Sequence, residues 1–295
     1  MQVITSREQM VSIAREIQRG GRTIGFVPTM GALHEGHLSL MREARSQCDV
    51  LVVSIFVNPA QFGPAEDFEK YPRDLDSDAD LLTRENVDYL FAPAVKDIYP
   101  PAFSTYVTVE GLSEHLEGAS RQGHFRGVAT VVAILLNIVR PDVAFFGQKD
   151  AQQAAVLKRM VRDLAFDTKV VVLPIVREES GLAMSSRNSY LNEEEKRAAT
   201  VLHRGLSRAA RAYVDGVRSG KGLIEIVRAT IEEEPLARID YVSLNDANTL
   251  TVLDDIEDQP ALLSLAVFLG KTRLIDNMVL GGASQKRDAA AVRGK

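Results

Sequence analysis

Two histidines, His34 and His37, stand three residues apart in the segment PTMGALHEGH, which follows an apolar run over residues 23–27. The apolar run, a turn containing Gly31 and Gly36, and then the imidazoles predict a strand that leads into a helix. The first N–H groups of a helix lack intrahelical partners, so phosphate binds well there, beside the imidazoles. Two solvated histidines at a helix start are the alternative. A metal pair is a third, although the zinc pattern His-Glu-x-x-His is absent.

A lysine follows another expected strand. Lys149, in the segment Gly-Gln-Lys-Asp, comes directly after the apolar residues 143–146. In a doubly wound sheet, ligands bind beyond the carboxyl ends of the strands, so we expect Lys149 to point into the crevice that His34 and His37 line. Its ammonium group would hold phosphate oxygens, and Asp150 would orient it. A solvated lysine in a turn is the alternative.

Two hydroxyl groups and a guanidinium group stand together further along the chain. Ser185, Ser186 and Arg187 follow Gly181 in a polar segment. Hydroxyl and guanidinium groups are good donors to phosphate oxygens. An ordinary polar linker explains the segment equally well, because loops are polar in any case. Taken with the two histidines and Lys149, this set indicates that the protein handles a nucleoside triphosphate.

Three amide side chains complete the set of candidates. Asn58 and Gln61 follow the apolar residues 50–57, and Gln153 lies one turn beyond Lys149. An amide donates and accepts hydrogen bonds without carrying a charge, which suits a small polyhydroxylated acid as ligand. Amides exposed in a turn and on a helix surface are an equally good interpretation.

The elements that must position these residues alternate along the chain. Apolar runs predict strands over residues 23–27, 50–57, 87–92, 143–147 and 169–176. Helical spacing predicts helices between them, among them one that begins with a capping box at Thr5 and others over residues 73–86, 128–139 and 151–163. This alternation predicts a doubly wound α/β domain. We expect it to span residues 1–175, followed by a smaller α+β domain over 176–282 and a disordered tail over 283–295.

Composition narrows the class of protein. The 295 residues carry a formal net charge of −5, which argues against binding to nucleic acid or to an anionic membrane. The one cysteine, Cys48, permits no intrachain disulfide and fits a reducing compartment. Residues 1–16 contain no apolar signal-peptide core, and the apolar runs over 128–139 and 262–269 are shorter than the ~18 residues of a membrane span. We therefore expect a cytoplasmic protein.

Six segments resemble one family in sequence and in order. They extend from residue 28 to residue 277 and read PTMGALHEGHLSL, SIFVNPAQFGPAEDFEKYPR, HFRGVATVV, FFGQKDAQQ, LAMSSRN and GKTRLIDN. The chain is similar in these segments to the pantothenate synthetases, or pantoate–beta-alanine ligases, of the nucleotidylyltransferase superfamily. The resemblance implies a Rossmann-like N-terminal domain, a smaller C-terminal domain and a homodimer.

The resemblance also implies a reaction in two steps. The carboxylate of pantoate attacks the α-phosphate of ATP, which enters with Mg²⁺, to give pantoyl adenylate and pyrophosphate. The amine of beta-alanine then displaces AMP to form pantothenate. Two other interpretations stay open: a nucleotidylyltransferase acting on a phosphorylated acceptor, and a nucleotide-binding regulator without turnover.

Site residues follow from the resemblance position by position. His37 is the implied proton donor, and His34 and His37 would stabilise the pentacoordinate phosphorus while Lys149 grips the phosphates. Gln61 would bind pantoate and beta-alanine and Gln153 would bind pantoate, with Asn58 a weaker candidate. The resemblance implies Mg²⁺ with the nucleotide but identifies no ligand for it. Asp76 and Asp78 are candidate ligands, although we favour their interpretation as carboxylates on a helix surface. The implied ATP-binding residues are Met30, Gly31, Ala32, Leu33, His34, Glu35, Gly36, His37, Gly147, Gln148, Lys149, Asp150, Val176, Met184, Ser185, Ser186 and Arg187.

Overall fold

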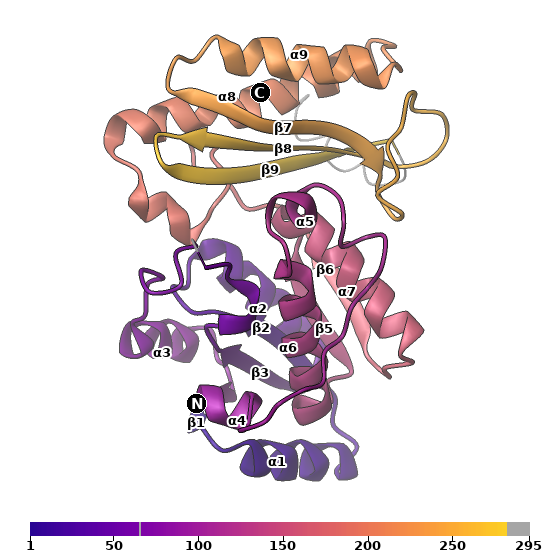
Figure 1. Cartoon of the computed structure of the whole chain (residues 1–295). Coiled ribbons are helices and arrows are strands. Elements are labelled where there is room, and N and C mark those ends of the chain that lie inside the picture. The colour runs from indigo at the N-terminus through magenta and orange to yellow at the C-terminus, as the bar shows by residue number, and fades with distance from the viewer. Residues whose placement is uncertain (65, 282–295) are drawn as a thin grey trace. The chain divides into compact units, whose positions relative to one another are not determined.

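A computed structural model describes residues 1–64 and 66–281 (Figure 1), so the predicted tail over 283–295 lies outside the described residues. The chain divides into two compact units. The first unit comprises Met1–Gln148 and Gln152–Val176, and the second comprises Lys149–Ala151 and Arg177–Lys295. Lys149 and Asp150 therefore group with the second unit, although they follow directly on a strand of the first.

The first unit is built on a six-stranded sheet in which all neighbouring strands are parallel. In spatial order its strands are β1 (Gln2–Ile4), β4 (Tyr89–Phe91), β3 (Val50–Ile55), β2 (Ile24–Thr29), β5 (Val143–Gly147) and β6 (Lys169–Leu173). The chain proceeds from β2 through β3 to β4 on one side and places β5 and β6 on the other. The carboxyl ends of β2 and β5 thus adjoin at the topological switch point, where such sheets bind ligands. The prediction of a doubly wound parallel sheet is confirmed.

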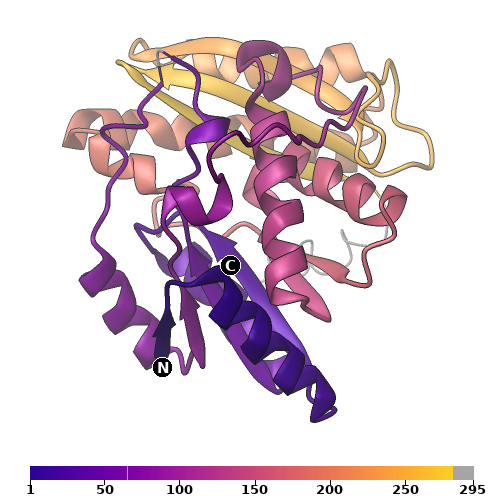
Figure 2. The ribbon, with the colours of Figure 1, turned by 60° about the horizontal axis from the view of Figure 1, so that its bottom comes forward.

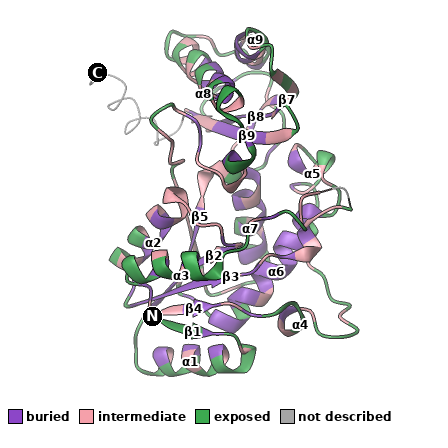
Figure 3. Cartoon of the chain, turned by 90° about the vertical axis from the view of Figure 1, so that its left-hand side faces the viewer, coloured by how far each residue is buried: buried purple, intermediate pink, exposed green. Residues whose placement is uncertain are grey.

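Helices cover both faces of this sheet. The helices of this unit are α1 (Arg7–Arg19), α2 (Glu35–Gln47), α3 (Leu75–Arg84), α4 (Val95–Ile98), α5 (Glu117–Ser120), α6 (His124–Val139) and α7 (Ala151–Asp163), with short 3₁₀ turns η1 (Pro59–Gln61) and η2 (Gln148–Asp150). On one face, Met41 of α2 and Leu82 of α3 pack against Val27 and Val53. On the other face, α1 packs against α6 (Figure 2). Helix α6 is buried along almost its whole length (Figure 3), as its apolar sequence predicts.

Three helices begin elsewhere than predicted, among them α3, which spans Leu75–Arg84 and not residues 73–86. Helix α1 is capped by Ser6 and not by Thr5, because the Ser6 hydroxyl accepts a hydrogen bond from the backbone N–H of Gln9 at 3.2 Å. Helix α6 begins at His124, four residues before the predicted start. The sequence His-Phe-Arg-Gly precedes the apolar run and forms the first helical turn after Gly123, whose φ is +80°.

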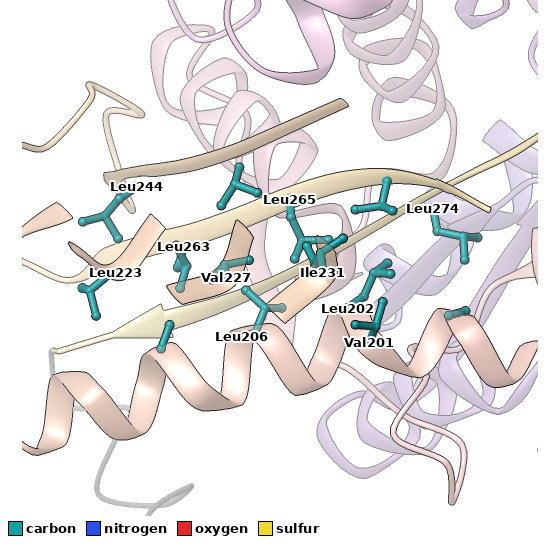
Figure 4. Packing of buried hydrophobic residues seen from close by; sticks show 14 of the residues in the cluster. Val201, Leu202, Leu206, Leu223, Val227, Ile231, Leu244, Leu263, Leu265 and Leu274 are labelled. Atoms are coloured by element: carbon teal, nitrogen blue, oxygen red, sulfur yellow. The ribbon is translucent and has the colours of Figure 1, made fainter. Parts of the chain in front are cut away.

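The second unit pairs two long helices with a three-stranded antiparallel sheet. Its elements are η3 (Ser186–Tyr190), α8 (Glu193–Val214), α9 (Gly220–Glu232), β7 (Ala237–Asp246), β8 (Ala261–Leu269) and β9 (Thr272–Leu280). Leu202 and Leu206 of α8 and Val227 of α9 pack against Leu263 and Leu265 of β8 (Figure 4). This is the α+β arrangement that the sequence predicts.

The apolar helices raise the question of a membrane span. Within residues 1–64 and 66–281, none of the helices combines the length and the apolar character that crossing a bilayer requires.

Candidate active site

The loop after β2 has an unusual backbone. Gly31 and Ala32 both have positive φ, +82° and +52° respectively. A side chain at Gly31 would be strained at this φ, and its Cβ would lie 2.9 Å from a carboxylate oxygen of Asp78. The N–H of Gly31 donates to the hydroxyl of Thr29 at 3.2 Å. Glycine is therefore required at this turn, as its place in the segment suggested.

Asp78 holds the next two residues of the same loop. The N–H of Ala32 donates to Oδ2 of Asp78 at 2.9 Å, and the N–H of Leu33 donates to Oδ1 at 2.8 Å. The prediction that Asp78 is a carboxylate on a helix surface is wrong, since its residue is only 4% exposed, whereas Asp76 is exposed. Burial raises the pKa of the Asp78 carboxyl, and the two N–H donors oppose that rise.

The two histidines cap helix α2. His34 is the N-cap residue, and its Nδ1 accepts from the N–H of Gly36 at 3.2 Å. The N–H of His34 donates to Nδ1 of His37 at 3.4 Å, and the two ring centroids are 4.1 Å apart. An imidazole that accepts at Nδ1 carries its proton at Nε2 when it is neutral. Both rings are thus set to donate from Nε2.

The hydrogen bonds of this junction occupy several backbone N–H groups at and before the helix start. The backbone N–H groups at positions 31, 32, 33, 34 and 36 all donate to acceptors within the protein. These five N–H groups are therefore already bonded within the protein. Glu35 contributes its carboxylate to an ion pair with Arg42, which also pairs with Glu85 at 2.5 Å.

Gln61 lies at the centre of a buried hydrogen-bond network. Its Oε1 accepts from Nδ2 of Asn58 at 3.0 Å, and its Nε2 lies 2.9 Å from the sulfur of Met30. Asn58 also donates to the carbonyl of Gly127 at 3.1 Å and accepts from the hydroxyl of Tyr99 at 2.7 Å. With these bonds Asn58 supports Gln61. The network brings together Met30 and Gln61, which lie 31 residues apart in the sequence.

His124 supports the same segment from α6. Its Nδ1 donates to the carbonyl of Gln61 at 2.8 Å, and its Nε2 lies 3.1 Å from a guanidinium nitrogen of Arg121. Arg121 in turn forms a bidentate ion pair with Glu66, at 2.8 and 2.7 Å. Burial, and then the positive charge of Arg121, lower the pKa of His124 to about 4. The ring is therefore neutral near pH 7, in the tautomer that both contacts require.

A cavity of about 110 Å³ adjoins this network. It is lined by Ala60, Gln61, Phe62, Tyr106, Gln122, Gly123, His124, Arg126 and Gly127. The guanidinium carbon of Arg126 lies 3.7 Å from the centroid of the Tyr106 ring. The cavity thus offers amide, imidazole and guanidinium groups, which is a suitable lining for a small acid.

Two adjacent glutamines of α7 have different surroundings. Gln152 is buried and accepts from the N–H of Glu117 at 3.0 Å. It also donates to the carbonyls of Leu112 and His115, at 2.9 and 2.7 Å. Gln153, the residue that the resemblance implies for pantoate, is only half-buried. Gln152 therefore holds the segment before α5, a role that the sequence did not suggest.

In the second unit, Lys149 is anchored through its backbone. Nδ2 of the buried Asn277 donates to the carbonyl of Lys149 at 3.0 Å. The ammonium group lies 3.8 Å from the carboxylate of Asp150, and the lysine side chain is 21% exposed. Asp150 is thus close enough to attract the ammonium group of Lys149, as predicted, while Gly147 and Gln148 remain in the first unit.

The conformation of the segment over 184–187 is fixed by hydrogen bonds within it and directly after it. Oγ of Ser185 accepts from the N–H of Arg187 at 3.3 Å and caps η3. Asn188 donates to the Glu178 carboxylate at 2.9 Å and to the carbonyl of Ala183 at 3.1 Å. Met184, Ser185, Ser186 and Arg187 are all half-buried, as is Val176 at the end of the first unit.

An ion pair between the half-buried Arg177 and the buried Asp276 lies beside both segments of the second unit. Arg177 contacts the carboxylate of Asp276 at 2.7 and 2.9 Å and also donates to the carbonyl of Gly181 at 3.1 Å. Asp276 accepts from the N–H of Asn277 at 2.8 Å. The pair thus connects strand β9 to the residues that precede 184–187. No pattern in the sequence indicates this role.

A metal ion would need a cluster of side-chain ligands. Among the described residues, no group of three or more His, Cys, Asp or Glu side chains gathers in a way that could hold one.

These features define a Rossmann-like α/β protein with an added α+β unit. Two imidazoles cap the helix that follows β2, at the switch point of the sheet. The model of the family described as Pantoate-beta-alanine ligase matches residues 2–279, and the chain belongs to this family. It is 55% identical over 281 residues to the pantothenate synthetase of Pelotomaculum thermopropionicum, covering 95% of this chain and 99% of that protein. It is 56% identical over 280 residues to that of Heliobacterium modesticaldum, with the same shares covered.

Solved structures agree with this assignment. The pantothenate synthetase of Thermus thermophilus superimposes with a TM-score of 0.89 at 44% identity, covering 94% of this chain and 99% of that one. The pantoate-beta-alanine ligase of Francisella tularensis superimposes with a TM-score of 0.79 at 36% identity, covering 95% and 97%. That structure is a complex with beta-gamma ATP and beta-alanine.

Proposed function

We propose that this chain is an ATP-dependent ligase that joins pantoate to beta-alanine through a pantoyl adenylate, with release of AMP and pyrophosphate. The observation that carries the proposal is the family match over residues 2–279. The complex of the Francisella tularensis relative with beta-gamma ATP and beta-alanine supports the choice of substrates.

The first step needs stabilisation of negative charge. When the pantoate carboxylate attacks the α-phosphate, charge accumulates on the oxygens of a pentacoordinate phosphorus before pyrophosphate leaves. His34 and His37 donate from Nε2 to these oxygens, and His37 supplies the proton. Their Nδ1 atoms are already bonded within the helix cap, so the rings need little reorganisation during the reaction. Lys149 binds the phosphates as a point charge.

The second step uses the adenylate as an activated acyl group. A free carboxylate is a poor acyl donor because oxide is a poor leaving group, whereas AMP leaves readily. The amine of beta-alanine attacks the acyl carbon, the C–O bond to AMP breaks, and the amine loses a proton. We assign Gln61 to both organic substrates and Gln153 to pantoate, with the cavity beside Gln61 as the site of the acids.

We assign the remaining ATP contacts by family position. They comprise residues 30–37, 147–150, Val176 and 184–187. Asn58 is assigned a supporting role only, because its side chain bonds to Gln61, Gly127 and Tyr99. Mg²⁺ enters with the nucleotide and is bound by phosphate oxygens, and we name no protein ligand for it. A homodimer and a cytoplasmic location complete the proposal.

Isotope exchange tests the first step. With ATP and labelled pyrophosphate, we expect label to enter ATP only when pantoate is present and without any need for beta-alanine. Exchange that proceeds equally well without pantoate would exclude the pantoyl adenylate. A stable dinucleotide-like product would indicate a nucleotidylyltransferase, and an ATP-dependent thermal shift without AMP release would indicate a regulator.

A further inference from the structure

We propose that Asp78 is a positioning residue for the proposed reaction. Its carboxylate fixes the backbone of residues 31–33 and thereby orients the rings of His34 and His37. The proposal rests on the proposed function of these histidines. Asp78 lies on α3, more than 40 residues along the chain from the loop, so its contacts exist only in the folded protein.

The geometry of the loop is that of an anion site. The turn at Gly31 and Ala32, both with positive φ, directs the N–H groups of Ala32 and Leu33 toward one point. At that point lies the carboxylate of Asp78, which accepts from Ala32 and Leu33, one bond to each oxygen. The protein thus fills its own anion site with a carboxylate.

Filling the site has two consequences. It fixes the path of the chain into the His34 cap, because residues 32 and 33 are bonded directly before it. In addition, the N–H groups of Ala32 and Leu33 already donate to Asp78, so they are not available to a nucleotide phosphate. The proposed phosphate donors are the imidazoles of His34 and His37. A buried carboxylate with two N–H partners is well satisfied, whereas its removal would leave two N–H groups without their acceptor.

The variant Asp78→Asn tests this arrangement. The amide keeps the size of the side chain but presents an NH₂ group to one of the two N–H donors, so one bond becomes a repulsive contact. We expect kcat for pantoate-dependent pyrophosphate exchange to fall by about 10- to 100-fold, with KM for beta-alanine in the full reaction unchanged. A purely structural loss would instead lower the concentration of folded enzyme and leave both constants of the folded fraction as they were.

Two residues of the same segment supply matched controls. Asp76→Asn makes the same change of charge at an exposed position and should leave exchange within about twofold of the wild type. Asp74→Ala removes the N-cap bond to the N–H of Ser77, so it should lower the free energy of unfolding without changing kcat. All assays are run at a temperature at which each variant is folded, checked by circular dichroism.

Each outcome decides the proposal. Exchange by Asp78→Asn equal to that of Asp76→Asn, with an active wild type, overturns the role of Asp78 and leaves the proposed function intact. A wild type without pantoate-dependent exchange overturns the proposed function itself. If Asp78→Asn does not fold, Asp78→Ser, which keeps one acceptor, is assayed in the same way. Failure of both to fold while Asp74→Ala folds also contradicts the proposal, since Asp78 would then determine the fold rather than the loop.

Discussion

The variant Lys149→Ala is expected to form pantoyl adenylate about 10²–10³-fold more slowly than the wild type, with the fold intact. The ammonium group is the cation that we assign to the phosphates, and alanine cannot replace its charge. The ion pair of this side chain with Asp150 is long, at 3.8 Å, and the Asp150 side chain is 49% exposed, so loss of the pair should cost little stability. The backbone bond from Asn277 to position 149 does not depend on the side chain.

Single-turnover measurement with labelled ATP and pantoate, without beta-alanine, isolates this step. The matched control is Lys158→Ala, since Lys158 is an exposed lysine on α7. It should form adenylate at the wild-type rate. Near wild-type adenylate formation by Lys149→Ala would refute the assignment of this lysine to the phosphates.

The variant Gly127→Ala is expected to lose about 3 kcal/mol of unfolding free energy and to bind pantoate poorly. A Cβ at this position would overlap the carbonyl oxygen of Ala60 and lie 2.7 Å from the N of Gln61. Backbone atoms cannot rotate away, so α6 and η1 would have to separate. That separation would break the bond from Asn58 to the carbonyl of Gly127.

Urea denaturation and KM for pantoate measure the two effects. The control is Gly222→Ala in α9, where the nearest atom to the new Cβ is a methyl group of Val217 at 3.5 Å. Because alanine favours a helix over glycine by about 1 kcal/mol, this control should be neutral or slightly stabilising. Equal stabilities of the two variants would show that the approach of η1 to α6 is not as close as described.

The sequence predicts the sheet well because its strands are buried on both faces. The run over 50–57 contains no alternation of apolar and polar residues, as expected for the interior of a parallel sheet, and it forms the central strand β3. Strand β5 and helix α7 have the predicted bounds, 143–147 and 151–163. The predicted strand over 23–27 agrees with β2 except at its ends, which is where local patterns carry least information.

Contacts made by tertiary packing could not be predicted in this way. Asp78 follows Asp74 and Asp76 in the first turn of α3 and has the same local pattern as an exposed carboxylate. Only the approach of α3 to the loop after β2 buries it. Likewise, Gln152 and Gln153 are indistinguishable in the sequence, and the register of α7 buries the first more than the second.

The site was predicted in part. The rings of His34 and His37 lie together at the start of α2, as their positions suggested, whereas no pattern predicted the contact of Met30 with Gln61. The N–H groups of Ala32 and Leu33, just before this helix, could not be predicted to donate to Asp78, which lies about 45 residues further along the chain. The assignment of all these residues to ATP, pantoate and beta-alanine stays a prediction.

Transfer of an oxygen atom from pantoate to AMP tests the adenylate most directly. Pantoate labelled with 18O in its carboxylate is incubated with the enzyme, ATP and beta-alanine, and the products are analysed by mass spectrometry. If the carboxylate attacks the α-phosphate, one labelled oxygen must appear in AMP and none in pyrophosphate. Label in pyrophosphate or in free phosphate, with unlabelled AMP, would contradict the mechanism.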